Sequence, residues 1–184
     1  MQMRHRFFGL VAFGLLASIA SAAQIENPFF KSWALCKPGT SVTLRSTRGA
    51  GTTQRVTEMK YTLVEVKPDE CLLNIEMTTE VRGAKRTMPA TNQKFPRELE
   101  STPDILKAKE AIDHASNVSV TVPAGTYKVK FVDKPAGSDA AVPFAIKMWV
   151  SLDVPGGTVK TETSRGAADS QVMSTTELIA IERK

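Results

Sequence analysis

The sequence predicts a mainly β fold, in which about eight or nine strands form one antiparallel sheet and a single short helix is inserted. Three observations carry this prediction. Apolar and polar residues alternate with a period of two in several segments, short turns rich in proline and glycine join these segments, and one segment has apolar residues at helical spacing. Short connections favour antiparallel neighbours, and a large sheet with one apolar face must curl or be covered.

Residues 1–22 are expected to be a secretory signal peptide. A basic start, Arg4-His5-Arg6, precedes an apolar run from Phe7 to Ala20, and small residues, Ala20-Ser21-Ala22, form a cleavage site. The apolar run is too short to span a bilayer comfortably. We therefore expect an exported protein, periplasmic or secreted, with no transmembrane anchor in its mature form.

Residues 23–38 are expected to be an irregular lead-in to a single β domain at 39–184. The dipeptide Asn27-Pro28 disfavours a helix in this segment, because the residue before a proline avoids helical backbone angles. Three aromatic residues of the lead-in either pack onto the body of the domain or form a binding surface: Phe29, Phe30 and Trp33.

Strand patterns begin after the lead-in. We expect strands at Ser41–Arg48 and Gln54–Val66, and the clearest alternation follows from Cys71 to Arg82. The apolar set of that third strand is Cys71, Leu73, Ile75, Met77 and Val81. A turn at Gly83-Ala84 then allows Lys85–Asn92 to pair back onto it.

The one predicted helix runs from Pro103 to Ala115. Thr102 supplies a hydroxyl cap, Pro103 occupies the first helical position, and Asp104 places an acid in the first turn. Apolar residues then recur at helical spacing: Ile105, Ala108, Ala111, Ile112 and Ala115.

Strands resume after the helix. We expect them at Val118–Val122, Tyr127–Phe131, Phe144–Val154, Thr158–Thr163 and Gln171–Ile181. One face of the last strand is predicted to carry Met173, Thr175, Ile179 and Ile181.

Trp149 breaks the alternation of its strand. It falls on the polar face, between Lys147 and Ser151, so a loop, the lead-in segment or a partner must cover it. Cover from within the chain and contact with a partner are both compatible with the sequence.

The two cysteines, Cys36 and Cys71, leave three interpretations open. An even count in an exported chain favours a disulfide, which would stabilise the fold by roughly 4 kcal/mol. The alternatives are two buried free thiols or a catalytic cysteine.

The sequence offers little catalytic chemistry. His114 is the only histidine after the expected cleavage site. The pair Asp113-His114 is interpreted as surface residues at the end of the predicted helix, where a cation is mildly favoured. No G-x-S-x-G elbow, H-E-x-x-H motif or P-loop occurs in the sequence. We therefore expect no enzyme, and we assign no catalytic, cofactor-binding or metal-binding residue and no cofactor.

The charge pattern does not predict a nucleic-acid partner. The net charge is +5, and it falls to +3 when Arg4 and Arg6 leave with the signal peptide. Lysines and arginines are scattered among acidic residues, which is typical of a solvated surface.

Three stretches of the second half carry a resemblance to a known group of proteins. Val120–Lys128, Met148–Lys160 and Glu177-Leu178 resemble, in that order, a secreted bacterial family of unknown function that is similar to the half-barrel of the lipoprotein-localisation factors. The resemblance implies a strongly curved antiparallel sheet, a half-barrel, with the short helix across or beside its concave face. In the better-known relatives that face holds an acyl chain.

The first functional hypothesis is an exported, soluble, non-enzymatic protein that binds a lipid or another apolar ligand on the dry face of the sheet. The residues expected on that face are Leu73, Ile75, Met77, Val129, Phe131, Ile146 and Met148. A carrier of this kind should enclose a cavity of about 300 Å³ or more.

Two other hypotheses remain open at this point. A module that binds an envelope protein would present Trp149 to its partner. A hydrolase would place His114 in a cleft with an acid and a nucleophile. The sequence identifies neither a ligand nor an oligomeric state.

Overall fold

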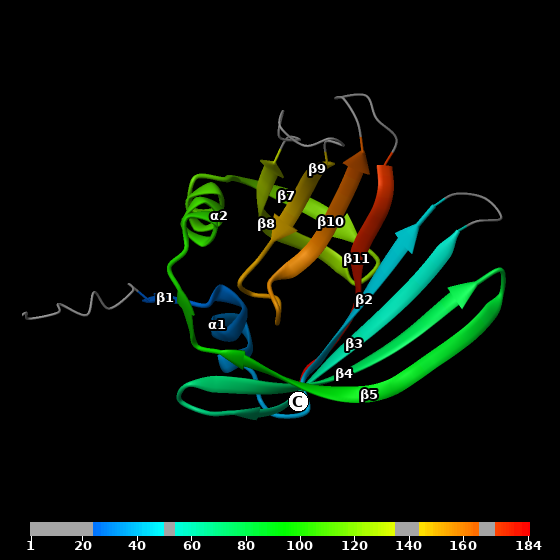
Figure 1. The fold of residues 1–184 in the computed structure, drawn as a ribbon, viewed down its shortest axis with the longest axis horizontal. Helices are drawn as coiled ribbons and strands as arrows, with labels where there is room; N and C mark the ends of the chain where they lie inside the picture. The colour runs from blue at the N-terminus through cyan, green and yellow to red at the C-terminus, as the bar shows by residue number, and fades with distance from the viewer. Residues whose placement is uncertain (1–23, 50–53, 135–143, 166–171) are drawn as a thin grey trace, which may run out of the picture.

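The computed structural model describes residues 24–49, 54–134, 144–165 and 172–184, and the expected signal peptide lies outside these residues. Eleven strands and two helices occur in the described residues (Figure 1). The helices are α1 (Pro28–Ala34) and α2 (Pro103–Asp113). The strands are β1 (Gln24–Glu26), β2 (Ser41–Arg48), β3 (Arg55–Val66), β4 (Glu70–Val81), β5 (Ala84–Pro96), β6 (Glu98–Glu100), β7 (Ser116–Val122), β8 (Gly125–Lys134), β9 (Phe144–Val150), β10 (Thr158–Arg165) and β11 (Val172–Glu182).

Nine of the strands form one antiparallel sheet in the order β5-β4-β3-β2-β11-β10-β9-β8-β7, and β1 pairs with β6 separately. The pairing of β2 with β11 joins two runs of sequential strands, β2 to β5 and β7 to β11. Figure 1 shows these two runs fanning away from each other, so the sheet is strongly curved. The predicted fold class, a mainly β protein with a large curved antiparallel sheet, is confirmed.

The segment before β2 is not irregular, and this part of the prediction is wrong. Asn27 has extended backbone angles and its Oδ1 accepts a hydrogen bond from the Phe29 amide at 3.0 Å, so it is the N-cap of α1. Pro28 occupies the first helical position, where a missing N–H costs nothing. The Asn-Pro dipeptide therefore starts a helix here instead of preventing one.

Helix α1 covers one face of the sheet, which we call the inner face. It contacts β3, β4 and β5, and its Phe30 and Trp33 are buried. These two side chains pack in one core with Leu63 and Leu73, which pair with each other across β3 and β4. Residues that pair with this set on neighbouring strands share the inner face, because paired residues point to the same side of a sheet.

The β7–β8 hairpin closes the other end of the sheet. It continues past the end of β9, and the Ala124 amide at its tip donates a hydrogen bond to the Leu178 carbonyl of β11 at 3.3 Å. Val122 and Val129 of the hairpin are buried in the same core as Leu178. The hairpin therefore packs back onto the strands beside it instead of extending the sheet into solvent.

Strand β11 departs from the predicted pattern. A register shift between Leu178 and Ala180 interrupts its alternation, and Leu178 is fully buried. As a result Ile181 pairs with Val42 on the inner face, whereas Thr175 pairs with Thr47 on the outer face. The expectation that these residues share one face with Met173 and Ile179 is wrong, because a bulge reverses the phase of a strand.

Helix α2 begins where the sequence predicted, with the Thr102 Oγ1 accepting from the Ile105 amide at 3.3 Å. It buries none of its residues, and it is tied to β8 through Lys130, whose ammonium donates to the carbonyls of Asp113 and Ala115. Neither helix of the described residues is long and apolar enough to cross a membrane.

Candidate functional site

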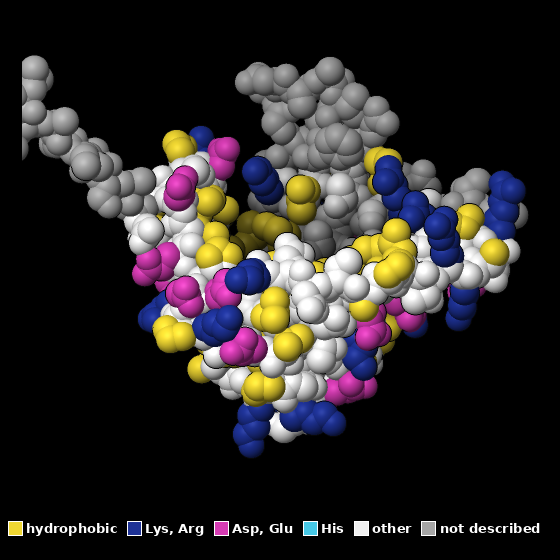
Figure 2. All heavy atoms as spheres, turned by 60° about the horizontal axis from the view of Figure 1, so that its bottom comes forward, with side chains coloured by type: hydrophobic (Ala, Val, Ile, Leu, Met, Phe, Trp, Pro, Cys, Tyr) yellow, Lys and Arg dark blue, Asp and Glu magenta, His cyan; other side chains and the backbone are white. Residues whose placement is uncertain are grey.

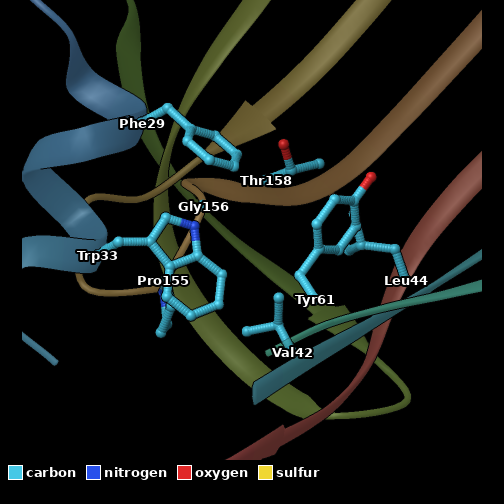
Figure 3. Close-up of a pocket in the computed structure, with 8 residues that line it drawn as sticks. All are labelled: Phe29, Trp33, Val42, Leu44, Tyr61, Pro155, Gly156 and Thr158. Atoms are coloured by element: carbon cyan, nitrogen blue, oxygen red, sulfur yellow. The ribbon is translucent and has the colours of Figure 1, made fainter. Parts of the chain in front are cut away.

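A small pocket opens on the inner face between α1, β2, β3 and the loop that joins β9 to β10. Its volume is about 90 Å³. The side chains and backbone that line it are Phe29, Trp33, Val42, Leu44, Tyr61, Pro155, Gly156 and Thr158 (Figure 3). These residues come from four separate parts of the chain, so the pocket depends on the whole fold.

The loop between β9 and β10 forms one wall of the pocket. Strand β9 ends at Val150, four residues before the predicted end, and the chain then closes on itself. The Ser151 amide donates to the Gly157 carbonyl at 2.8 Å, and the Gly157 amide donates to the Val154 carbonyl at 2.8 Å. Val154 is buried in the core through this turn and not through a strand.

Helix α1 is fastened to that loop through Ser32. The Gly156 amide donates to the Ser32 Oγ at 2.9 Å, and the same hydroxyl donates to the Phe29 carbonyl at 2.8 Å. Gly156 has a φ of +80°, and a Cβ there would lie 3.4 Å from Phe29 Cε2 and from Trp33 Nε1. Glycine therefore adopts this positive φ without strain and places no side-chain atom against the two rings.

Trp33 carries the most unusual polar group of the pocket. The residue is 0% exposed, and its indole N–H has no hydrogen-bond partner within the described chain. Figure 3 places the indole nitrogen on the side of Gly156, at the pocket wall. A buried donor without an acceptor costs about 1–3 kcal/mol.

Two hydroxyl groups complete the polar inventory of the pocket. Tyr61 lies opposite Trp33 (Figure 3), and its hydroxyl donates only to the Met59 sulfur, at 3.7 Å. Burial raises the pKa of Tyr61 above its ordinary value of 10.0, so the phenol stays neutral. Thr158 supplies the second hydroxyl. Within the described chain, no charged residue lines the pocket.

A row of apolar side chains leads away from the pocket across four strands. Leu44 of β2 is opposite Met59 of β3, Met59 is opposite Met77 of β4, and Met77 is opposite Met88 of β5. Leu44, Met59 and Met77 are half-buried and Met88 is 47% exposed. We call Met59, Met77 and Met88 the methionine row; it spans about 10 Å at the usual strand spacing.

Polar residues border the methionine row on the side away from α1. Ser46, Thr57 and Thr79 follow one another across β2, β3 and β4, and the hydroxyls of Thr57 and Thr79 are 3.3 Å apart. On the other side lie Tyr61 and Ile75, which pair with each other. Figure 2 shows hydrophobic side chains on the walls of a hollow in the molecular surface. The inner face thus changes from a buried core to a partly open apolar strip and then to a polar border.

Five of the seven residues predicted to form an apolar ligand face do lie on the inner face. They are Leu73, Ile75, Met77, Ile146 and Met148. The prediction that the whole set shares one face is wrong for the other two. Phe131 is opposite Trp149, whereas Val132 is opposite Met148, so Phe131 and Val129 point to the outer face. The apolar face of β8 is turned because the hairpin packs back over its neighbours.

Trp149 is covered by residues of its own chain. The Phe131 ring lies 5.0 Å away between centroids, and the Lys160 ammonium lies 5.4 Å from the Trp149 ring. Lys160 is held there by Glu162 at 3.0 Å and Glu177 at 3.4 Å. Trp149 is half-buried by these contacts, and its contact with a partner stays a prediction.

Both cysteines are free thiols in the structure, which corrects the predicted disulfide; of the alternative of two buried free thiols, only Cys71 is fully buried. Cys71 is 0% exposed in the core, and Cys36 is half-buried with its Sγ donating to the Ser32 carbonyl at 3.5 Å. Burial raises the pKa of both thiols above 9.0, so neither is an activated nucleophile at neutral pH.

His114 lies at the C-cap of α2 and is exposed. Its neighbour Asp113 pairs with Lys109 one turn earlier, and this hydrogen bond lowers the pKa of Asp113 below 3.8. Among the described residues, no group of three His, Cys, Asp or Glu side chains could hold a metal ion.

Sequence reasoning singled out Phe29 and Trp33 of the pocket but missed the residues on the other elements. The sequence predicts only that Val42, Leu44 and Tyr61 belong to strands. No local pattern shows that β2 and β3 face α1. The one local signal was the turn Pro155-Gly156-Gly157, which marks a sharp reversal but not a pocket wall.

No protein-family model matches this chain, and no curated protein matches it. Two solved structures have the same fold. A protein from Bacteroides fragilis, described as exported and as having a YmcC-like fold, has a TM-score of 0.52 and 11% identity, with 80% of this chain and 97% of that chain covered. A protein from Parabacteroides distasonis, described as a lipoprotein, has a TM-score of 0.50 and 13% identity, with 79% and 96% covered. At these identities the likeness concerns the fold alone.

Proposed function

We propose that this chain is an exported, non-enzymatic protein whose inner face binds an elongated apolar ligand such as an acyl chain. The basic, apolar and small-residue order of residues 1–22 supports export. The two proteins of the same fold are described as an exported protein and a lipoprotein, which agrees with that location. The resemblance to the half-barrel of the lipoprotein-localisation factors points to the same class of ligand.

One observation carries the proposal: the pocket beside Trp33 continues into the methionine row. Methionine side chains are flexible and polarizable, and they adapt to apolar ligands of varied shape. Met88 remains 47% exposed at the far end of the row, although its partner on the inner face, Met77, is apolar. A chain lying on this row would cover apolar surface that the protein itself leaves open.

The size of the pocket decides how such a ligand would lie. The volume of about 90 Å³ is well below the 300 Å³ expected of a carrier that encloses its ligand. The pocket can therefore take only one end of an acyl chain. The rest would lie along Met59, Met77 and Met88, in the hollow of the inner face.

The test compares two substitutions on adjacent residues of β5. Met88 points to the inner face opposite Met77, whereas Thr87 points to the outer face opposite Thr78, and both are exposed. We expect Met88→Lys to weaken the binding of monopalmitoyl glycerol by roughly tenfold, the equivalent of about two buried methylene groups. Thr87→Lys should leave that affinity unchanged.

Chain length supplies the second arm of the same experiment. Monooctanoyl glycerol should bind Met88→Lys and the unmodified protein equally, because a short chain that starts in the pocket does not reach the end of the row. Binding is followed by tryptophan fluorescence below the micelle-forming concentration. Failure of both glycerides to bind, or equal effects of the two lysine substitutions, would contradict the proposal.

A further inference from the structure

Trp33 indicates which end of the ligand enters the pocket. Its indole N–H is buried without a hydrogen-bond partner among the described residues, and it lies beside Gly156 in the lining of the pocket. We infer that the pocket receives a neutral hydrogen-bond acceptor of the ligand, an ester or amide carbonyl oxygen, which accepts from Trp33 Nε1. This inference rests on the proposed function and specifies its ligand class.

The lining of the pocket selects between a neutral and a charged acceptor. The lining residues of the described chain include no Lys, Arg or His that could pair with a carboxylate. An unpaired anion is costly to bury, whereas a carbonyl needs only a donor. Burial raises the pKa of Tyr61, in keeping with surroundings that disfavour negative charge. An ionised fatty acid is therefore a poorer ligand than its ester.

The neighbouring hydroxyls support the same orientation. The Tyr61 hydroxyl donates only to a thioether sulfur, which is a weak acceptor, at 3.7 Å. Thr158 presents a second hydroxyl at the pocket (Figure 3). A carbonyl placed here would accept from Trp33, and the Tyr61 and Thr158 hydroxyls add polar groups to the same lining. The hydrocarbon chain would then leave over Leu44 toward Met59.

The experiment uses three probes of matched length: methyl decanoate, ionised decanoate and undecane. The chain has two tryptophans, so Trp149→Phe leaves the indole of Trp33 as the single reporter and keeps a ring against Phe131. We expect methyl decanoate to shift the Trp33 indole N–H resonance and to slow its hydrogen exchange. Methyl decanoate should bind at least about tenfold more tightly than decanoate.

A second variant tests the hydrogen bond directly. Trp33→Phe keeps an aromatic ring but removes the donor. It should therefore lower the affinity for methyl decanoate by roughly twofold to tenfold and leave the affinity for undecane unchanged. The resonance measurement needs no change at Trp33 and remains decisive if Trp33→Phe does not fold.

Other outcomes separate the inference from the proposed function. If undecane binds as tightly as methyl decanoate and the N–H resonance does not move, water satisfies the indole and the inference fails while the proposed function stands. Tighter binding of decanoate would identify an anion site and also overturn the inference. If none of the three probes binds, the proposed function itself fails.

Discussion

At the scale of single residues, the pocket depends on two adjacent glycines that do different work. Gly156 and Gly157 both have positive φ, +80° and +74°. A Cβ on residue 156 would contact Phe29 and Trp33, whereas a Cβ on residue 157 would have nothing within 4 Å. Gly156 is therefore required both for the positive φ of the turn and for the space beside Phe29 and Trp33. Gly157 is required for its positive φ alone.

This difference predicts the behaviour of two alanine variants. Gly156→Ala and Gly157→Ala should each lower the free energy of unfolding by about 1–2 kcal/mol, because a side chain disfavours positive φ. Gly156→Ala should also change the fluorescence emission of Trp33, since its methyl group lies against the indole. Denaturant titration and emission spectra check the pair. Equal emission changes in both variants would contradict the assigned packing.

At the scale of elements, the two helices contribute unequally to stability. Helix α1 buries Phe30 and Trp33 in the core, whereas α2 buries no residue. The N-cap of α1, Asn27, is itself buried, and its Nδ2 also donates to the Pro96 carbonyl at 2.8 Å. The cap thus connects α1 to the end of β5.

Removal of each N-cap should therefore have different effects. Asn27→Ala should lower the free energy of unfolding by about 1–3 kcal/mol, because it removes both the cap of α1 and the hydrogen bond from Asn27 to the Pro96 carbonyl. Thr102→Ala should change it by less than about 0.5 kcal/mol and only fray α2. Chemical denaturation followed by tryptophan fluorescence measures both. A large effect of Thr102→Ala would show that α2 packs more firmly than its exposure indicates.

The sequence predicted most elements but not how they face one another. Alternation identified most strands of the large sheet because they have a wet face and a dry face. Strand β5 is exposed along almost its whole length, and it was predicted from the turn before it. Asn27-Pro28 was misread because the same dipeptide can end an extended segment or cap a helix. Val129 and Phe131 were assigned to the wrong face because alternation within β8 does not reveal how the hairpin turns. Tyr61 and Trp33 meet only through tertiary packing, which no local pattern encodes.

At the scale of the whole molecule, the two halves of the sheet are held together where β2 meets β11. Glu182 near the end of β11 accepts hydrogen bonds from the Ser41 hydroxyl at 2.8 Å and from the Lys60 ammonium at 3.0 Å. The hydrogen bond from Lys60, followed by that from Ser41, lowers the pKa of Glu182 below its ordinary value of 4.5. One carboxylate therefore links β2, β3 and β11.

This arrangement predicts how stability depends on pH. Because the pKa of Glu182 is lower in the folded chain, the unfolded chain binds this proton more readily. The contribution of Glu182 to the free energy of unfolding is therefore complete above about pH 5. It is lost as the pH falls through the lower pKa of the folded state. Glu182→Gln should reduce the loss of unfolding free energy between about pH 5 and pH 3. Because the group is exposed, added salt should reduce the difference. Identical pH profiles for the two proteins would contradict this assignment.

The position of β11 has a consequence for how the chain acquires its fold. The last strand of the sequence is an interior strand of the sheet, and β2, the first strand of that sheet, has it as a neighbour. Contacts between segments so distant in sequence form slowly, because the entropy cost of closing a long loop comes before the favourable energy of the contacts. While the polypeptide is being synthesised, β2 can pair with β3 but lacks its other partner until residues 172–182 leave the ribosome. The complete sheet therefore forms only after residues 172–182 have been synthesised.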